Sequence, residues 1–136
     1  VKTEYKRSDI AIAAAAVADF TPQSVAPQKL KKGKSNLSLS LIPTEDILAY
    51  MGKNKKKHRL IGFALETENE LENAKIKLKQ KNLDGIVLNS LQDPGAGFSV
   101  STNKITFIHS DHSIKTFPLQ SKLECAHRIF EQILSL

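Results

Sequence analysis

Apolar and polar positions along the chain alternate between strand-like and helix-like patterns. Asp9–Val17 is a run of small apolar residues without alternation, and its length and the loop that follows favour a central strand covered on both faces. Leu37–Ile42 alternates leucine or isoleucine with serine, which predicts a half-buried strand. Short apolar runs predict four more strands, the last two forming a hairpin around Asp111 and His112: Leu60–Leu65, Gly85–Asn89, Lys104–His109 and Ile114–Phe117.

Helical spacing predicts helices between these strands. Pro43 and Thr44 begin a helix that continues to about Gly52, with Thr44 as its N-cap and Glu45 and Asp46 in its first turn. The remaining helical segments are the end of a helix at Val1–Arg7, Asn69–Asn82 with an apolar face of Leu71, Ala74 and Leu78, and Ser121–Leu136 with Leu123, Ala126, Ile129, Phe130 and Ile133 at helical spacing.

Strands that alternate with helices predict an α/β sheet with helices on its faces. Ligands of such sheets bind beyond the carboxyl ends of the strands. The segments beginning at Ala18, Thr44, Glu66 and Ser90 are therefore expected at one edge. Ala18–Lys34 contains Pro22, Pro27 and Gly33, so it is expected to be a functional loop without regular structure.

Composition places the chain among folded domains. It has 136 residues, of which 40% are hydrophobic and 25% charged, which fits one domain over residues 1–136 and argues against a disordered tail. No run approaches the roughly 18 apolar residues of a membrane span. The charged amino end predicts no signal peptide. The single cysteine excludes an intrachain disulfide and a multi-cysteine zinc site, and we expect a reducing, cytoplasmic compartment.

The chain is basic, with 20 Lys and Arg against 14 Asp and Glu, a net charge of +6 and a pI near 9.5. This favours an anionic partner: nucleic acid, an anionic membrane surface or a phosphate-bearing small molecule. The lysines gather in three clusters, around Lys29–Lys34, Lys53–Arg59 and Lys75–Lys81. No aromatic residues interleave with them and there is no tryptophan, so nucleic acid is not the expected partner. A membrane is not expected as a partner either.

No familiar catalytic motif is present. Cys125 lies on the last helix and is expected to be a packing residue, and His109 and His112 flank a hairpin turn and are not expected to ligate a metal. Gly95-Ala96-Gly97 is neither a Walker loop nor a dinucleotide fingerprint.

The lysine clusters admit two interpretations. Lys53–Arg59 is expected to be a solvated face at the opposite end of the sheet. Lys77 and Lys81, spaced i and i+4, form either a solvent-facing stripe or an ammonium pair that holds phosphates.

Several segments nevertheless carry a resemblance, in order and spacing, over nearly the whole chain: AAAVADF (14–20), VAPQKLKK (25–32), TEDIL (44–48), IGFALET (61–67), AKIKLKQKNLD (74–84) and GFSVSTNKITFI (97–108). They resemble the bacterial phosphopantothenoylcysteine synthetase domain, also called phosphopantothenate–cysteine ligase. The resemblance implies a Rossmann-like three-layer sandwich with a mostly parallel central sheet and a carboxyl-terminal β-hairpin plus helix. It also implies a homodimer.

The resemblance further implies the reaction. CTP, with Mg²⁺ on its phosphates, activates the carboxylate of 4′-phosphopantothenate as an acyl-cytidylate, and cysteine then displaces CMP. A flavin is expected only in a fused partner domain, not in this chain.

Site residues follow from the same resemblance. Lys29 matches a catalytic, nucleotide-contacting lysine on a mobile flap at residues 18–34, and Ala15 and Ala16 match substrate-binding positions. The other matches are nucleotide contacts: Ala13, Asp19, Thr44, Glu45, Asp46, Ile47, Phe63, Lys77 and Lys81. Thr44 and Glu45 stand where the family usually has Asn-Pro.

Other functions remain open from the residues alone. The family's domain begins with a glycine-rich strand and turn that these residues lack, so we expect the chain by itself to show little ligation. The alternatives are a nucleotide-binding Rossmann-like domain without ligase activity and a basic nucleic-acid-binding module.

Overall fold

A computed structural model describes residues 1–31, 36–90 and 100–136. Contacts divide the chain into two units, one of Val1–Ala14 with Leu48–Leu136 and one of Ala15–Ile47. The first unit holds α1 (Lys2–Tyr5), β1 (Ile10–Ala13), β4 (Arg59–Glu66), α3 (Glu70–Gln80), β5 (Gly85–Ser90), β6 (Thr102–His109), β7 (Ile114–Ser121) and α4 (Lys122–Leu134). The second holds β2 (Phe20–Pro22) and β3 (Leu41–Pro43), and α2 (Ile47–Lys53) begins at its last residue.

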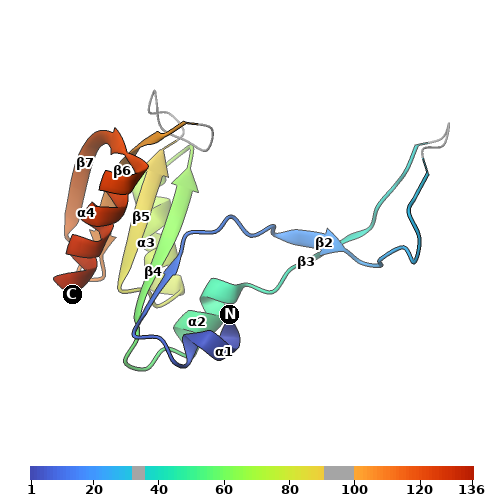
Figure 1. Ribbon diagram of the computed structural model, residues 1–136, viewed down its shortest axis with the longest axis horizontal. Helices are drawn as coiled ribbons and strands as arrows, with labels where there is room; N and C mark the ends of the chain where they lie inside the picture. Colours follow the sequence, from blue (N-terminus) through green and yellow to red (C-terminus); the bar gives the residue numbers. More distant parts are fainter. Residues whose placement is uncertain (32–35, 91–99) are drawn as a thin grey trace. The chain divides into compact units, whose positions relative to one another are not determined.

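The first unit is built on a five-stranded sheet with the order β1-β4-β5-β6-β7 (Figure 1). Strands β1, β4 and β5 are parallel, whereas β6 runs antiparallel to β5 and β7 antiparallel to β6. The predicted fold class, with a parallel centre and a carboxyl-terminal hairpin and helix, is confirmed.

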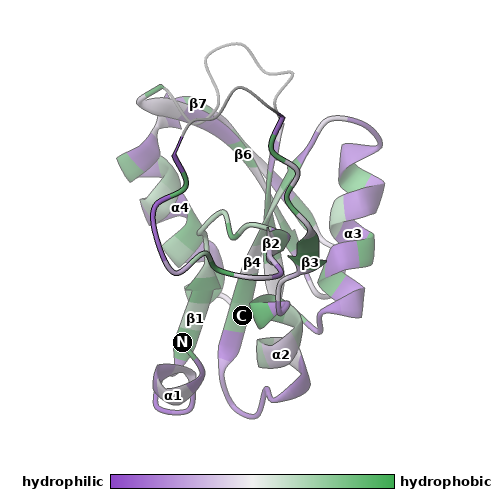
Figure 2. Cartoon of the chain, turned by 90° about the vertical axis from the view of Figure 1, so that its right-hand side faces the viewer, coloured by the Kyte–Doolittle hydropathy of each residue, from purple (hydrophilic) through white to green (hydrophobic). Residues whose placement is uncertain are grey.

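Helices α4 and α3 cover opposite faces of this sheet (Figure 2). On the α4 face, alternate strand residues Ile61, Val87 and Phe107 pack against Cys125 and Ile129 in one buried cluster. Because side chains of a strand alternate between faces, the residues between them point to the α3 side.

β1 differs from its prediction as a central strand covered on both faces. In the described part of the chain it is an edge strand, since it pairs only with β4, from Ile10 opposite Arg59 to Ala13 opposite Gly62. Its residues are half-buried or exposed, because no described strand lies on its other side.

The second unit also departs from prediction. Residues 18–34 were expected to lack regular structure, but Phe20–Pro22 pairs with Leu41–Pro43 in an antiparallel two-stranded sheet. The expected half-buried strand Leu37–Ile42 is wrong, because only its last two residues belong to β3 and its apolar side chains are exposed. Alternation of leucine and serine gives a strand one apolar face, but it does not determine whether another element packs against that face.

Helix ends and faces were predicted in part. α2 begins at Ile47, so Glu45 and Asp46 are not in its first turn, and the hydroxyl of Thr44 donates to the Ala18 carbonyl at 2.6 Å. In α3, Ala74 and Leu78 are buried as predicted, whereas Leu71 is exposed. In α4, Leu123 and Phe130 are exposed, because Cys125, Ile129, Gln132 and Ile133 form the buried face.

The basic segment Lys53–Arg59 is not simply solvated. Lys55 forms a half-buried ion pair with Asp84 at 3.0 Å, and a ring nitrogen of His58 lies 2.6 Å from the Ser8 carbonyl oxygen. Asp84 also accepts from the backbone N–H of the buried Leu60. Part of this segment therefore holds the amino end of β4 in place.

Some predicted features fall outside the described residues, among them Lys32, Gly33, Lys34 and the loop Gly95-Ala96-Gly97. In the part of the chain that the structure describes, no helix combines the length and apolar character needed to span a bilayer.

Candidate functional site

Two of the predicted nucleotide-site residues meet at the end of the parallel pairing. β1 pairs with β4 only as far as Gly62, and Phe63 is the next residue of β4. The Phe63 carbonyl accepts a hydrogen bond of 2.8 Å from Nζ of Lys77, which reaches across from α3. The Lys77 side chain is half-buried, and its ammonium is thereby held beside the point of β4 where pairing with β1 ends and pairing with β5 continues.

Lys81 lies one helical turn further, at the end of α3. Asn82 adopts a positive φ of 51° just beyond it, as asparagine often does at helix ends, and its Nδ2 donates to the Gly52 carbonyl at 3.0 Å. α2 approaches so closely here that a Cβ on Gly52 would lie 1.9 Å from the Lys81 carbonyl oxygen. The glycine therefore allows α2 to pack against the end of the helix that carries both lysines.

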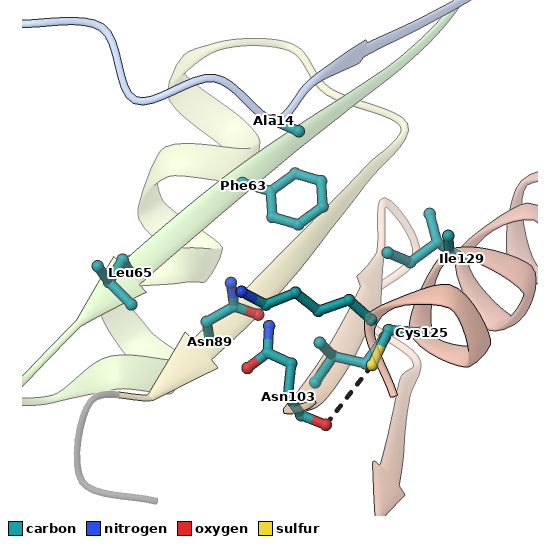
Figure 3. A pocket seen from close by; sticks show the side chains of 10 residues that line it. Ala14, Phe63, Leu65, Asn89, Asn103, Cys125 and Ile129 are labelled. Atoms are coloured by element: carbon teal, nitrogen blue, oxygen red, sulfur yellow. Dashed lines mark hydrogen bonds between the residues drawn. The ribbon is translucent and has the colours of Figure 1, made fainter. Parts of the chain in front are cut away.

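The ring of Phe63 lines a cavity of about 290 Å³ between the sheet and α4 (Figure 3). The lining comes from β4, β5, β6, α4 and the residue after β1: Ala14, Phe63, Leu65, Asn89, Asn103, Ile105, Lys122, Cys125, Ala126 and Ile129. Its walls are mainly apolar, with two asparagines and one lysine as the polar groups. Such a cavity suits a small molecule with an apolar body and a few polar groups.

Asn89 and Asn103 were not singled out by the sequence. Asn89 stands near the carboxyl end of β5 opposite Ile105 of β6, and β6 carries a register irregularity between Asn103 and Ile105. Bulges of this kind redirect side chains and often occur beside active sites. An asparagine inside a buried strand is the only signal in the sequence that could have indicated the cavity.

Cys125 contributes its side chain to the cavity wall, and its thiol donates a weak hydrogen bond of 3.5 Å to the Asn103 carbonyl. Burial is the main cause that raises the pKa of this thiol. The prediction of a packing residue is confirmed, since Cys125 belongs to the buried cluster.

The carboxyl ends of β4 and β5 lie side by side, with Glu66 opposite Ser90, as predicted for parallel strands. Asn73 donates to Glu66 at 3.4 Å, and Ser90 donates to Glu70 of α3. These carboxylates are held within the first unit by hydrogen bonds from neighbouring elements.

In the second unit, Asp19 and Thr44 are adjacent. The N–H of Thr44 donates to the Asp19 carbonyl at 2.9 Å, next to the hydroxyl bond to Ala18. The other predicted residues of this unit are largely exposed: Ala15, Ala16, Lys29, Glu45 and Asp46, with Ile47 half-buried. Ala13 is half-buried in β1. The predicted site residues are thus divided between the two units.

Within the described residues, no three His, Cys, Asp or Glu side chains gather as a metal site would require. Neither His109 nor His112 belongs to such a cluster in this part of the chain. His109 instead lies 3.3 Å from Oε1 of Gln132, and its ring packs against Phe107.

The family model of the DNA/pantothenate metabolism flavoprotein C-terminal domain matches residues 1–136. The chain belongs to this family. The predicted resemblance is thereby confirmed.

Relatives agree with that assignment. The chain is 43% identical over 136 residues to the coenzyme A biosynthesis bifunctional protein CoaBC of Bacillus subtilis, covering 100% of this chain and 34% of that protein. It is 54% identical over 133 residues to a cysteine/cysteine sulfinic acid decarboxylase of an unknown prokaryotic organism, covering 97% of this chain and 37% of that protein. The chain therefore spans little more than a third of the length of these relatives.

A solved structure of the C-terminal domain of CoaBC matches with a TM-score of 0.76 and 36% identity, covering 98% of this chain and 59% of that one. The DNA/pantothenate metabolism flavoprotein from Streptococcus pneumoniae matches in fold, with a TM-score of 0.77 and 20% identity, covering 98% of this chain and 66% of that one.

Proposed function

We propose that this domain carries out CTP-dependent ligation of L-cysteine to 4′-phosphopantothenate, a step of coenzyme A biosynthesis. The observation that carries the proposal is the Lys77 ammonium held at 2.8 Å from the Phe63 carbonyl, with Lys81 one turn away. Ammonium groups at a binding site are what a triphosphate requires, because they neutralise its charge as the transition state forms. Membership of a family that includes the coenzyme A biosynthesis protein CoaBC supports the same function.

The first step forms an acyl-cytidylate. A carboxylate oxygen of 4′-phosphopantothenate attacks the α-phosphorus of CTP, the bond between the α- and β-phosphates breaks, and pyrophosphate leaves. The ammonium groups of Lys77 and Lys81 stabilise the charge that gathers on the phosphate oxygens.

In the second step the cysteine amine attacks the acyl carbon, the bond to the phosphate oxygen breaks, and CMP leaves with its electron pair. The amine loses a proton as the amide forms. Lys29 is proposed to act here and in the first step, from an exposed position in the second unit, by closing over bound substrates and excluding water from the acyl-cytidylate.

Mg²⁺ in this proposal accompanies the nucleotide phosphates. The described residues hold no cluster of three acidic or imidazole ligands, so this part of the chain fits a metal carried by CTP better than a metal held by protein ligands alone. Bound there, the ion would neutralise phosphate charge.

A cytoplasmic homodimer is part of the proposal. The second unit exposes apolar side chains in its two strands and just before β3, including Phe20 at 59%, Leu39 at 59% and Leu41 at 55%. Apolar side chains exposed together on a small two-stranded sheet are typical of a surface that another chain covers. Sedimentation of the protein and of Leu39→Ser/Leu41→Ser tests this, because a dimer that survives both substitutions would argue against that surface.

Pyrophosphate release with 4′-phosphopantothenate tests the reaction, first without and then with cysteine. Release with CTP before cysteine is added supports the acyl-cytidylate. Comparable release with ATP would contradict the choice of nucleotide, because a pocket that hydrogen-bonds a pyrimidine edge rejects a purine.

The alternative is a domain that binds nucleotide without ligating. A relative named as a decarboxylase contains a stretch that is 54% identical to this chain. Similar sequences therefore occur both in a protein named as a decarboxylase and in proteins named for coenzyme A biosynthesis. Thermal stabilisation by CTP with Mg²⁺ in a protein that releases no pyrophosphate would favour this alternative.

A further inference from the structure

A second cavity lies at the end of the first unit where strands β1 and β4 begin. It has a volume of about 550 Å³ and is formed by α1, the end of α2 and the segment just before β4. Figure 1 shows α1 and α2 at this end of the sheet. None of the residues with a role in the proposed ligation lines this α1–α2 cavity, so the ligation leaves it without a function.

The walls of the α1–α2 cavity carry charge of one sign. Four lysines and a histidine line it: Lys2, Lys6, Lys56, Lys57 and His58. No Asp or Glu is among the described residues of the lining, and the nearby carboxylate of Asp84 pairs with Lys55. Ammonium groups that share one concave surface repel one another and concentrate positive potential there. A bound anion would remove that repulsion.

Contacts between the elements around the α1–α2 cavity hold its walls together. A ring nitrogen of His58 lies 2.6 Å from the Ser8 carbonyl oxygen, and the His58 ring packs against that of Tyr5 with 4.5 Å between the ring centroids. Nζ of Lys2 lies 4.4 Å from the centroid of the Tyr50 ring. These contacts join α1 both to α2 and to the segment before β4. A cavity that is already formed loses less free energy to ordering when a ligand binds.

We propose that the α1–α2 cavity binds a small phosphate-bearing anion with at least two negative charges, of which inorganic pyrophosphate is a simple representative. Each phosphate oxygen accepts charge-assisted hydrogen bonds, and each lysine supplies up to three donors for them. The cationic groups surround a cavity, which suits a small molecule, whereas a nucleic acid requires cationic groups along an extended surface. The inference does not depend on the proposed function, because it rests on other residues.

Titration with inorganic pyrophosphate, followed by backbone-amide NMR, tests the site. We expect saturable shifts of the amide signals of Tyr5 and His58 in the wild type, and a Kd that rises about fivefold or more in Lys56→Ala/Lys57→Ala. Lys79→Ala/Lys115→Ala is the matched control, since it removes two exposed charges from outside the cavity and should change the Kd less than twofold. The amide of Lys77 reports the proposed nucleotide site in the same titration, so the two sites are measured separately.

Two further variants separate a binding role of these lysines from a structural one. Lys56→Arg/Lys57→Arg keeps both charges and should bind pyrophosphate within twofold of the wild type. Lys6→Ala, which removes a charge from the α1 side of the cavity, should raise the Kd and, without pyrophosphate, should melt no lower than the wild type, because it relieves repulsion.

Three results would overturn the inference. The first is a wild type without saturable shifts at Tyr5 and His58, and the second is an equal loss of affinity in Lys56→Ala/Lys57→Ala and its control, which would indicate diffuse attraction. The third is displacement of pyrophosphate from these residues by an equimolar short single-stranded oligonucleotide, which would assign the lysines to a nucleic acid instead.

Discussion

Nζ of Lys77 donates a hydrogen bond to the carbonyl oxygen of Phe63 at 2.8 Å. This bond connects the last turn of α3 to the first residue of β4 beyond its pairing with β1. The hydrogen bond fixes the position of the positively charged ammonium group of Lys77. Lys79, on the same helix, is instead exposed.

Lys77→Ala should weaken CTP binding by about 1–3 kcal/mol, as expected for the loss of a charge-assisted contact. Lys79→Ala is the control, since it removes the same charge from an exposed position two residues away. Titration calorimetry with CTP measures both. Equal losses in the two variants would indicate diffuse electrostatic attraction and not a site.

Lys29→Ala should lower the rate of ligation while leaving CTP affinity and melting temperature nearly unchanged. Lys29 is exposed in the second unit and lies in no helix or strand, so its removal costs no packing. Single-turnover rates with bound CTP are the measurement, and Lys115→Ala, another exposed lysine, is the control. A fall of several degrees in melting temperature with an unchanged rate would assign Lys29 a structural role.

Gly52→Ala should destabilise the protein by about 1–3 kcal/mol, because overpacking forces the surrounding backbone to move. The new Cβ would lie 1.9 Å from the Lys81 carbonyl oxygen, and a backbone atom cannot move aside as the end of a side chain can. CTP affinity should fall as well, since the end of α3 has to shift. Urea unfolding and CTP titration test both effects, with Lys53→Ala on the same helix as control; an alanine variant as stable as the wild type would contradict the close approach.

Asp84→Ala should be more destabilising than Lys55→Ala. Loss of Lys55 removes one ion pair, whose side chains are 14% and 18% exposed, but leaves the Asp84 carboxylate in place to accept from Leu60. Loss of the Asp84 carboxylate also leaves the N–H of the buried Leu60 without this acceptor, which costs about 1–3 kcal/mol. Urea unfolding of both variants gives the difference, and equal losses would mean that the ion pair alone matters.

Glu124 should make stability pH-dependent in the acid range. It forms a capping box with Ser121 at the start of α4, and hydrogen bonds from Ser121 lower the pKa of its carboxyl group. A group whose pKa is lowered by folding stabilises the protein above its unfolded pKa, and that stabilisation disappears as the pH falls through the folded pKa. The melting temperature of Glu124→Gln should therefore be lower than that of the wild type at pH 7, and the difference should be smaller at pH 3, below the ordinary glutamate pKa of about 4.3. A difference that is the same at both pH values would exclude the ionised cap, and Glu131→Gln serves as the control on the same helix.

The local pattern of apolar and polar residues was enough to predict most strands of the first unit. Leu60–Leu65, Gly85–Asn89 and the hairpin around Asp111 were predictable because short buried strands are apolar and turn residues end them. The family and its fold class were also predictable, because the motifs that carry them are continuous segments of sequence.

Tertiary structure alone decided which apolar residues are covered and which polar residues meet. Leu39 and Phe130 are as apolar as any core residue, yet both are exposed, because burial depends on what packs against a surface. Lys77 and Phe63 are 14 residues apart, and Asn89 and Asn103 come from different strands, so no spacing in the sequence indicates either pair. The cavity and the position of the ammonium group arise from the pairing of β4, β5 and β6 and the packing of α3 and α4 against them, which local sequence patterns do not specify.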